Sequence, residues 1–118
     1  MLGYLHDIGN CVNRTDHAHS GAIIAYNILK DMGMPVDERT EIMMAIGNHD
    51  ENTGTAVSDI SAALILADKS DVHRDRVTNT NLSTFDIHDR VNYAVTEAKL
   101  KIDKETRKII LNLKIDTK

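Results

Sequence analysis

Five histidine and aspartate side chains of the chain have the chemistry of metal ligands, and each lies on or beside an apolar stretch. They are His6, Asp7, His17, His49 and Asp68. An isolated carboxylate is costly to bury, so an aspartate among apolar residues generally has a cation or hydrogen-bond donors beside it. Imidazole and carboxylate together suit Mn, Fe, Co, Ni or Zn, whereas Mg prefers oxygen ligands. The residue types therefore predict a divalent metal site.

The number of candidate ligands exceeds what one tetrahedral ion needs. Three histidines and two aspartates suit two ions that share a bridging carboxylate and keep open positions for water and substrate. Two ions about 3.5–4 Å apart lower the pKa of a bridging water and clamp an in-line displacement at phosphorus. The ligand set is therefore typical of a two-metal site for phosphate chemistry.

Four of these residues also have a purely structural explanation. His6 and His49 can be core histidines that are hydrogen-bonded to the backbone, and Asp7 can cap a helix. His17 can be a solvent-exposed residue at a helix N-terminus, where its neighbour His19 competes with it for any functional role. The residue types alone leave these alternatives open.

Asp68 is harder to explain without a functional role, because it directly follows a run of six apolar residues. It can pair with a nearby cation, namely Lys69, Arg74 or Arg76. A second adjacent pair, His88 and Asp89, lies among polar residues, and we interpret it as the solvated start of a helix. We interpret the cysteine and four of the methionines as packing residues, namely Cys11, Met32, Met34, Met43 and Met44.

Apolar residues recur with helical spacing over the first two thirds of the chain. Ile42, Ala45 and Ile46 form one such stripe, and His49 occupies the next position on it, so we expect His49 to face inward. The apolar run that precedes Asp68 predicts the central, most buried helix. The expected helices cover residues 2–13, 16–32, 37–49 and 59–72, with caps at Thr15 or Asp16, at Asp37, and at Ser58 or Asp59, and a short helix over 85–93.

Hydrophobicity alternates with a period of two on both sides of a Lys104-Glu105 turn, which predicts a β-hairpin. A lone hairpin is marginal in water, so we expect it to pack on the helices or to pair with another chain, including a second copy. The fold class is thus mainly α, with four or five helices followed by a C-terminal β-hairpin. The expected divisions are a helical metal-binding core over 1–76, a loop and short helix over 77–92, and the hairpin over 93–118.

Composition sets the broad class of the protein. A length of 118 residues suits one domain, and the formal net charge of −4 argues against a general nucleic-acid binder. One cysteine, no signal-peptide pattern and no membrane-spanning apolar run predict a cytoplasmic protein. Because the first residues read as the middle of a helix, we expect the chain to be a piece of a longer protein.

Four segments in register resemble the HD-domain superfamily of metal-dependent phosphohydrolases, over residues 2–76. They are Leu5-His6-Asp7-Ile8-Gly9-Asn10, His17-Ala18-His19-Ser20-Gly21-Ala22, Ala45-Ile46-Gly47-Asn48-His49 and Leu66-Ala67-Asp68-Lys69. The second segment is similar to that of the two-metal branches, in which the histidine four positions before the glycine is the ligand. This favours His17 over His19. The chain looks closest to bacterial HD hydrolases that cleave diadenosine tetraphosphate.

The resemblance implies a role for each candidate. Asp7 bridges two ions, His17 and His49 hold one of them, and His6 and Asp68 hold the other with a further histidine from a helix upstream of the doublet. That helix would precede Met1, Asn10 stands where a lysine is common, and no GYP segment follows His49. Asp7 is thus an expected catalytic residue. By their proximity to Asp68, Lys69, Arg74 or Arg76 are expected to neutralise phosphate charge, and of these we assign a catalytic role to Lys69.

The expected function is hydrolysis of a small-molecule phosphate ester or anhydride, in particular that of a nucleotide, by a metal-activated hydroxide. An alternative is a degenerate HD domain that binds a metal or nucleotide, or mediates oligomerisation, without turnover. A third is a structural helical domain whose histidines are satisfied by the backbone. Metal content and turnover distinguish the three.

Overall fold

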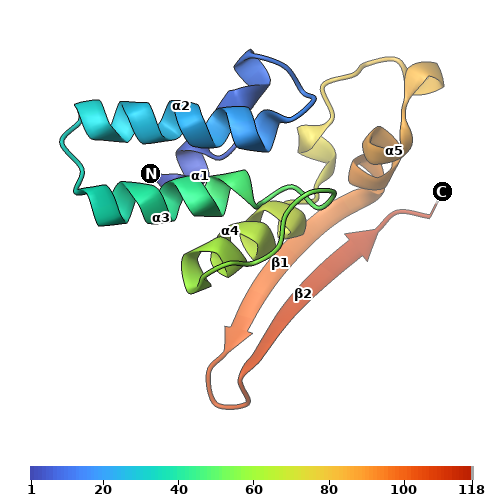
Figure 1. Ribbon diagram of the computed structural model, residues 1–118. Helices are drawn as coiled ribbons and strands as arrows, with labels where there is room; N and C mark the ends of the chain where they lie inside the picture. Colours follow the sequence, from blue (N-terminus) through green and yellow to red (C-terminus); the bar gives the residue numbers. More distant parts are fainter. Residues whose placement is uncertain (118) are drawn as a thin grey trace. The chain divides into compact units, whose positions relative to one another are not determined.

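The computed structural model describes residues 1–117. The protein is mainly α-helical and ends in a two-stranded antiparallel hairpin, as the sequence predicts (Figure 1). The chain divides into two compact units, Met1–Asp68 and the segment from Lys69 onward. Among the described residues, no helix combines the length and the apolar character that crossing a membrane requires.

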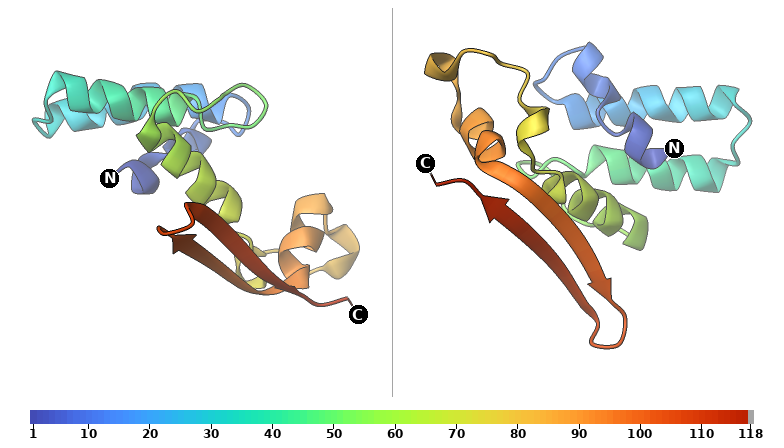
Figure 2. Two further views of the ribbon diagram at one scale, coloured as in Figure 1. Left: turned by 90° about the horizontal axis from the view of Figure 1, so that it is seen from below. Right: turned by 180° about the vertical axis from the view of Figure 1, so that it is seen from behind.

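The first unit is built around an antiparallel pair of helices, α2 (His17–Asp31) and α3 (Val36–Gly47), which lie side by side in Figures 1 and 2. The other helical elements are α1 (Leu2–Leu5), the 3-10 turn η1 (Ile8–Cys11) and α4 (Asp59–Ser70), whose last two residues pass the unit boundary. The core consists of apolar side chains from α1, α2 and α3, namely Leu5, Ala22, Ala25, Leu29, Ile42 and Ile46.

The turn between α2 and α3 follows the predicted stop signals, but the predicted cap is wrong. Gly33 has a φ of 82°, which favours glycine, and Pro35 precedes the first residue of α3. Asp37, the predicted cap, lies instead inside the first turn of α3. Proline has a fixed φ and no N–H, so it can precede the helix without losing a hydrogen bond. A carboxylate in the first turn still interacts favourably with the helix dipole.

The expected helix over 2–13 is interrupted. α1 ends at Leu5, and the chain turns into η1 because Gly9 packs directly on α2. A Cβ atom on Gly9 would overlap the His17 carbonyl oxygen and would lie 2.7 Å from the Gly21 nitrogen. Only a residue without a side chain allows this close approach, which brings the His6-Asp7 pair to the N-terminus of α2.

Replacing Gly9 by alanine is therefore expected to destabilise the first unit by at least about 2 kcal/mol, because backbone atoms must move to admit the methyl group. Urea denaturation measures the loss. Gly3→Ala is the matched control: an added Cβ there meets nothing within 4 Å, so its stability should be unchanged or slightly raised. Equal stability of the two variants would contradict the close packing of Gly9.

The apolar helix α4 is not the most buried one, contrary to the prediction. Within α4 only Ser61 and Leu64 are buried, and Leu66 is 36% exposed. An all-apolar surface is buried only where other elements surround it, and α2 and α3 pack mainly on each other.

The prediction for Cys11 is also wrong, because this residue is exposed. Of the methionines, Met34 and Met43 pack on the core, whereas Met32 and Met44 are exposed.

The second unit contains the 3-10 turns η2 (Arg74–Arg76) and η3 (Leu82–Thr84), helix α5 (Ile87–Ala94) and strands β1 (Val95–Asp103) and β2 (Lys108–Ile115). The strands pair with Leu100 opposite Leu111, across a turn over 104–107 that is longer than the predicted Lys104-Glu105 turn. One face of the hairpin is apolar, and its large side chains are 39–64% exposed, namely Leu100, Ile102, Ile109, Leu111 and Leu113.

Candidate metal centre

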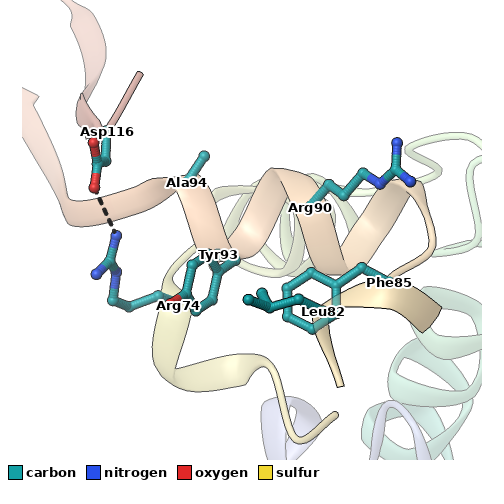
Figure 3. A pocket seen from close by; sticks show the side chains of 7 residues that line it. All are labelled: Arg74, Leu82, Phe85, Arg90, Tyr93, Ala94 and Asp116. Atoms are coloured by element: carbon teal, nitrogen blue, oxygen red, sulfur yellow. Dashed lines mark ion pairs between the residues drawn. The ribbon is translucent and has the colours of Figure 1, made fainter. Parts of the chain in front are cut away.

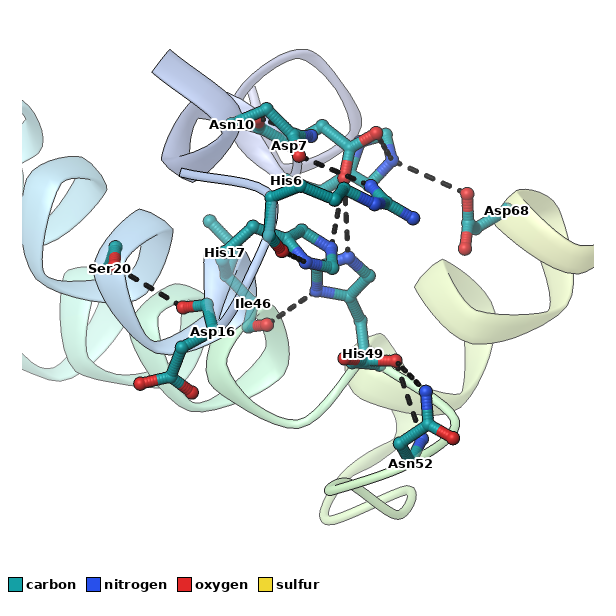
Figure 4. Close-up of polar contacts among 12 residues, drawn as sticks. His6, Asp7, Asn10, Asp16, His17, Ser20, Ile46, His49, Asn52 and Asp68 are labelled. Atoms are coloured by element: carbon teal, nitrogen blue, oxygen red, sulfur yellow. Dashed lines mark hydrogen bonds and ion pairs between the residues drawn. The ribbon is translucent and has the colours of Figure 1, made fainter. Parts of the chain in front are cut away.

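The carboxylate of Asp7 faces three histidine rings in the first unit (Figure 4). Its Oδ2 lies 3.6 Å from Nε2 of His6. Its Oδ1 lies 3.4 Å from Nε2 of His17 and 3.5 Å from Nε2 of His49. On the other side, Nε2 of His6 lies 3.5 Å from Oδ1 of Asp68. The structure therefore brings all five predicted metal ligands into one cluster.

The Nδ1 atom of each histidine ring is hydrogen-bonded to a backbone carbonyl oxygen. Nδ1 of His6 lies 2.7 Å from the Gly3 carbonyl oxygen. Nδ1 of His17 lies 3.2 Å from the Arg14 carbonyl oxygen, and Nδ1 of His49 lies 2.6 Å from that of Ile46. A carbonyl oxygen can only accept, so each Nδ1 carries the proton and donates it. The lone pair of each neutral ring then lies on Nε2, which is the arrangement that metal-ligating histidines use.

The ligand atoms form two overlapping groups. One comprises His6, His49 and Asp68, and the other comprises Asp7, His17 and His49; within each group, the atoms lie within 4.8 Å of one another. His49 belongs to both groups, and its ring packs edge-on against the rings of His6 and His17, at centroid distances of 5.3 and 5.1 Å. The two Asp7 oxygens divide between the groups, with Oδ2 toward His6 and Oδ1 toward His17 and His49.

The spacing of these atoms suits an ion better than direct hydrogen bonds. The four nitrogen–oxygen distances of 3.4–3.6 Å exceed the usual upper limit of about 3.2 Å for N–H···O. Two ligands each about 2.1 Å from one ion, at angles between octahedral and tetrahedral, are about 3.0–3.4 Å apart. The observed separations begin at the upper end of this range, and the donor types suit a divalent ion, so this buried His/Asp cluster could hold a metal.

Burial differs across the cluster. The side chains of His49 and His17 are 2% and 6% exposed, whereas those of Asp7 and His6 are 45% and 21% exposed. The deep side is therefore formed by the rings of His49 and His17, and the solvent side by the Asp7 carboxylate and His6. A small solute can approach the cluster from the side of Asp7.

His49 reaches the cluster from a loop rather than from a helix. α3 ends at Gly47, and Asn48 terminates it with φ −111° and ψ 13°. The His49 N–H still donates to the Ile46 carbonyl, so the ring stays on the inner side that the apolar stripe predicts. Gly54 packs against the Asn48 backbone, where a Cβ would collide with the Asn48 carbonyl. Burial of His49 is confirmed, although its helical position is not.

Two helix starts position other ligands. Asp16 precedes α2 with a left-handed φ of 63°, and no side-chain cap bond forms; instead its Oδ1 lies 2.6 Å from Nδ1 of His19. His19 thereby points away from the metal groups, and His17 is buried. α4 begins as predicted, because the Ser61 N–H donates to Oγ of Ser58 at 3.1 Å. This helix carries Asp68 in its last turns.

The predicted phosphate-binding cations lie outside the two ligand groups. Lys69 follows Asp68 near the end of α4, and its side chain is exposed. Arg74 pairs with Asp116 at 3.6 Å, and Arg76 pairs with Asp71 at 3.3 Å, both within the second unit. The comparison residue His88 is exposed on α5, as predicted.

A separate pocket of about 360 Å³ lies in the second unit (Figure 3). Its lining includes the Arg74–Asp116 pair and two aromatic rings, those of Phe85 and Tyr93, which stack edge-on. Arg74 lies over the Tyr93 ring at 5.0 Å from its centroid. None of the five candidate metal ligands lines this pocket.

Sequence reasoning missed two polar residues beside the cluster. Nδ2 of Asn10 donates to the Asp7 carbonyl oxygen at 3.1 Å, and Nη1 of Arg14 donates to Oδ1 of Asn10 at 3.2 Å. Arg14 lies between η1 and α2, outside both helical elements, so no helical spacing in the sequence predicts this contact. Comparison of the chain with protein-family models, with curated proteins and with solved structures finds no match.

Proposed function

We propose that the protein is a metal-dependent phosphohydrolase of the HD type. The observation that carries this proposal is the convergence of three histidine Nε2 atoms on one carboxylate, that of Asp7, at 3.4–3.6 Å. The four-segment resemblance to HD domains supports it, because the residues of those segments are the ones that converge. Divalent ions held by His6, Asp7, His17, His49 and Asp68 would supply Lewis acidity and an activated water for hydrolysis at phosphorus.

The chain's own residues prepare this site. The carbonyls of Gly3, Arg14 and Ile46 accept hydrogen bonds from the Nδ1–H groups of the three imidazoles and turn each Nε2 toward the Asp7 carboxylate. The partly exposed Asp7 and His6 side chains form the side from which substrate enters. In this proposal the substrate is a small phosphate ester or anhydride such as a nucleotide, and Lys69, the residue after Asp68 in α4, is a candidate cation for its charge.

A binding module without turnover is the second candidate. The exposed apolar face of the hairpin favours it, since such a face suits a partner chain or a second copy. In that case the cluster holds a metal ion but does not use it for hydrolysis.

Hydrolysis of bis(p-nitrophenyl) phosphate in the presence of Mn²⁺ tests the proposal. We expect turnover in the wild type and at least about a 100-fold loss in Asp7→Ala, because that variant loses the carboxylate on which the three histidine Nε2 atoms converge. Asp31→Ala removes an exposed carboxylate at the opposite end of α2 and should keep wild-type turnover. Bound metal without any turnover would favour the binding module instead.

A further inference from the structure

We propose that the guanidinium of Arg14 binds an anionic phosphoryl oxygen of the substrate at this cluster. The inference rests on the proposed function and names a substrate-binding residue for it. Sequence reasoning had assigned phosphate charge to Lys69, Arg74 or Arg76, two of which pair with carboxylates in the second unit.

The charge balance of the first unit calls for such a residue. Residues 1–68 contain ten acidic side chains and three basic ones, namely Arg14, Lys30 and Arg39. A phosphate ester that approaches this unit meets a negative surface, and close like charges oppose binding. A cation of the chain near the cluster would add to the attraction that bound metal ions exert on the phosphate group.

Two of the three cations are placed elsewhere. Arg39 donates to the Met34 carbonyl at 2.7 Å, and its hydrogen bond to the Tyr26 side chain lowers the pKa of that phenol from its ordinary value. Lys30 is in the last turn of α2, thirteen residues after His17, which is about 20 Å along a helix at 1.5 Å per residue. Among the three cations of residues 1–68, Arg14 is the one that remains for the cluster.

Hydrogen bonds connect Arg14 to two of the candidate metal ligands, directly to His17 and through Asn10 to Asp7. Its carbonyl oxygen accepts the Nδ1–H of His17 at 3.2 Å. Its guanidinium donates to Oδ1 of Asn10, whose Nδ2 in turn donates to the Asp7 carbonyl oxygen. A single amide group therefore separates the guanidinium from the backbone of Asp7, whose side chain is 45% exposed.

The link through Asn10 leaves the positive charge available. The amide oxygen of Asn10 is neutral, so it holds the guanidinium in place without neutralising it, as a carboxylate would. A guanidinium has five N–H donors, and one of them is used here. The others can form the charge-assisted, two-pronged hydrogen bonds that arginine makes with phosphate oxygens. The position and the free donors of Arg14 both suit a phosphoryl group.

The test compares Arg14→Ala, Arg14→Lys and the control Lys30→Ala, which removes one positive charge at the far end of α2. Metal content is measured first by mass spectrometry. The Michaelis constant for bis(p-nitrophenyl) phosphate and the inhibition constant of inorganic phosphate follow, with Mn²⁺ present. We expect Arg14→Ala to retain its metal, to raise both constants about 10-fold or more, and to change kcat less.

The remaining variants sharpen the result. Arg14→Lys should recover part of the affinity, because lysine keeps the charge but lacks the planar fork. Lys30→Ala should match the wild type in metal content and in both constants. Rescue by lysine would identify charge at this position, rather than packing, as the cause.

Each contrary outcome has a distinct meaning. Wild-type constants in Arg14→Ala, with turnover intact, would overturn the inference and leave the proposed function standing. Loss of metal in Arg14→Ala would assign the residue to holding the Asp7 and His17 loop, which also overturns the inference. Absence of metal or turnover in the wild type would reject the proposed function, and the inference with it.

Discussion

Replacing His49 by alanine is expected to abolish metal binding, whereas replacing His17 or His6 should remove only part of the bound metal. The difference follows from the two ligand groups, because His49 belongs to both and each of the others belongs to one. Mutations of residues that merely orient a ligand cost about 10–100-fold in metal affinity, so loss of a ligand shared by two groups should cost more than 100-fold.

Metal content of the purified variants, measured by mass spectrometry after loading with Mn²⁺ or Zn²⁺, checks this order. His88→Ala is the matched control, since His88 is exposed on α5 and outside both groups. Because His49 is 2% exposed, an alanine variant can lose stability for packing reasons alone. His49→Gln keeps most of the side-chain volume, and circular dichroism verifies its fold. Equal metal losses in the His17, His6 and His49 variants would contradict the shared role of His49.

The five candidate ligands that the sequence suggests lie together in the structure, and local patterns around several of them are strong. The apolar stripe through Ile42 and Ile46 predicts that His49 faces inward, and it does, although the helix ends at Gly47. Likewise, Ser58 caps α4 as its position suggests, and so fixes the helix that carries Asp68. Periodicity and capping depend on neighbouring residues, and these are visible in a single sequence.

The failures concern contacts between distant segments. The break after Leu5 depends on Gly9 touching the backbone of His17 and Gly21, and nothing local in residues 2–13 reveals that contact. The sequence overestimates the burial of α4 for the same reason. An apolar run shows which side chains favour burial, but it does not show which other elements pack on them. The exposure of Cys11 also follows from the direction that η1 takes after Gly9.

The cation at the site illustrates the same limit. Proximity in sequence to Asp68 pointed to Lys69, Arg74 and Arg76, but ion pairs with Asp116 and Asp71 hold the two arginines in the second unit. Arg14 comes close to Asp7 through a side-chain bridge across Asn10, and that bridge depends on the turn of η1. Roles that depend on side-chain direction across a turn need coordinates.

Metal binding is expected to stabilise the first unit strongly, and α4 most of all. The ligands come from four separate segments, around residues 6–7, 17, 49 and 68, so a bound ion joins parts of the chain that are distant in sequence. α4 contributes only Ser61 and Leu64 to the buried residues, which leaves it few apolar contacts of its own. An ion held by Asp68 would therefore add much of what fixes this helix in place.

The expected size follows from mass action. A metal concentration 100 times the dissociation constant adds about 2.7 kcal/mol to the free energy of unfolding, which corresponds to a melting temperature about 10–20 °C higher for a unit of this size. Thermal unfolding with Mn²⁺ and with a chelator measures the shift, and amide hydrogen exchange locates it. In Asp68→Ala the added protection of α4 should vanish, while that of α2 near His17 persists. Identical melting with metal and with chelator would show that the histidines and aspartates form a hydrogen-bonded structural cluster rather than a metal centre.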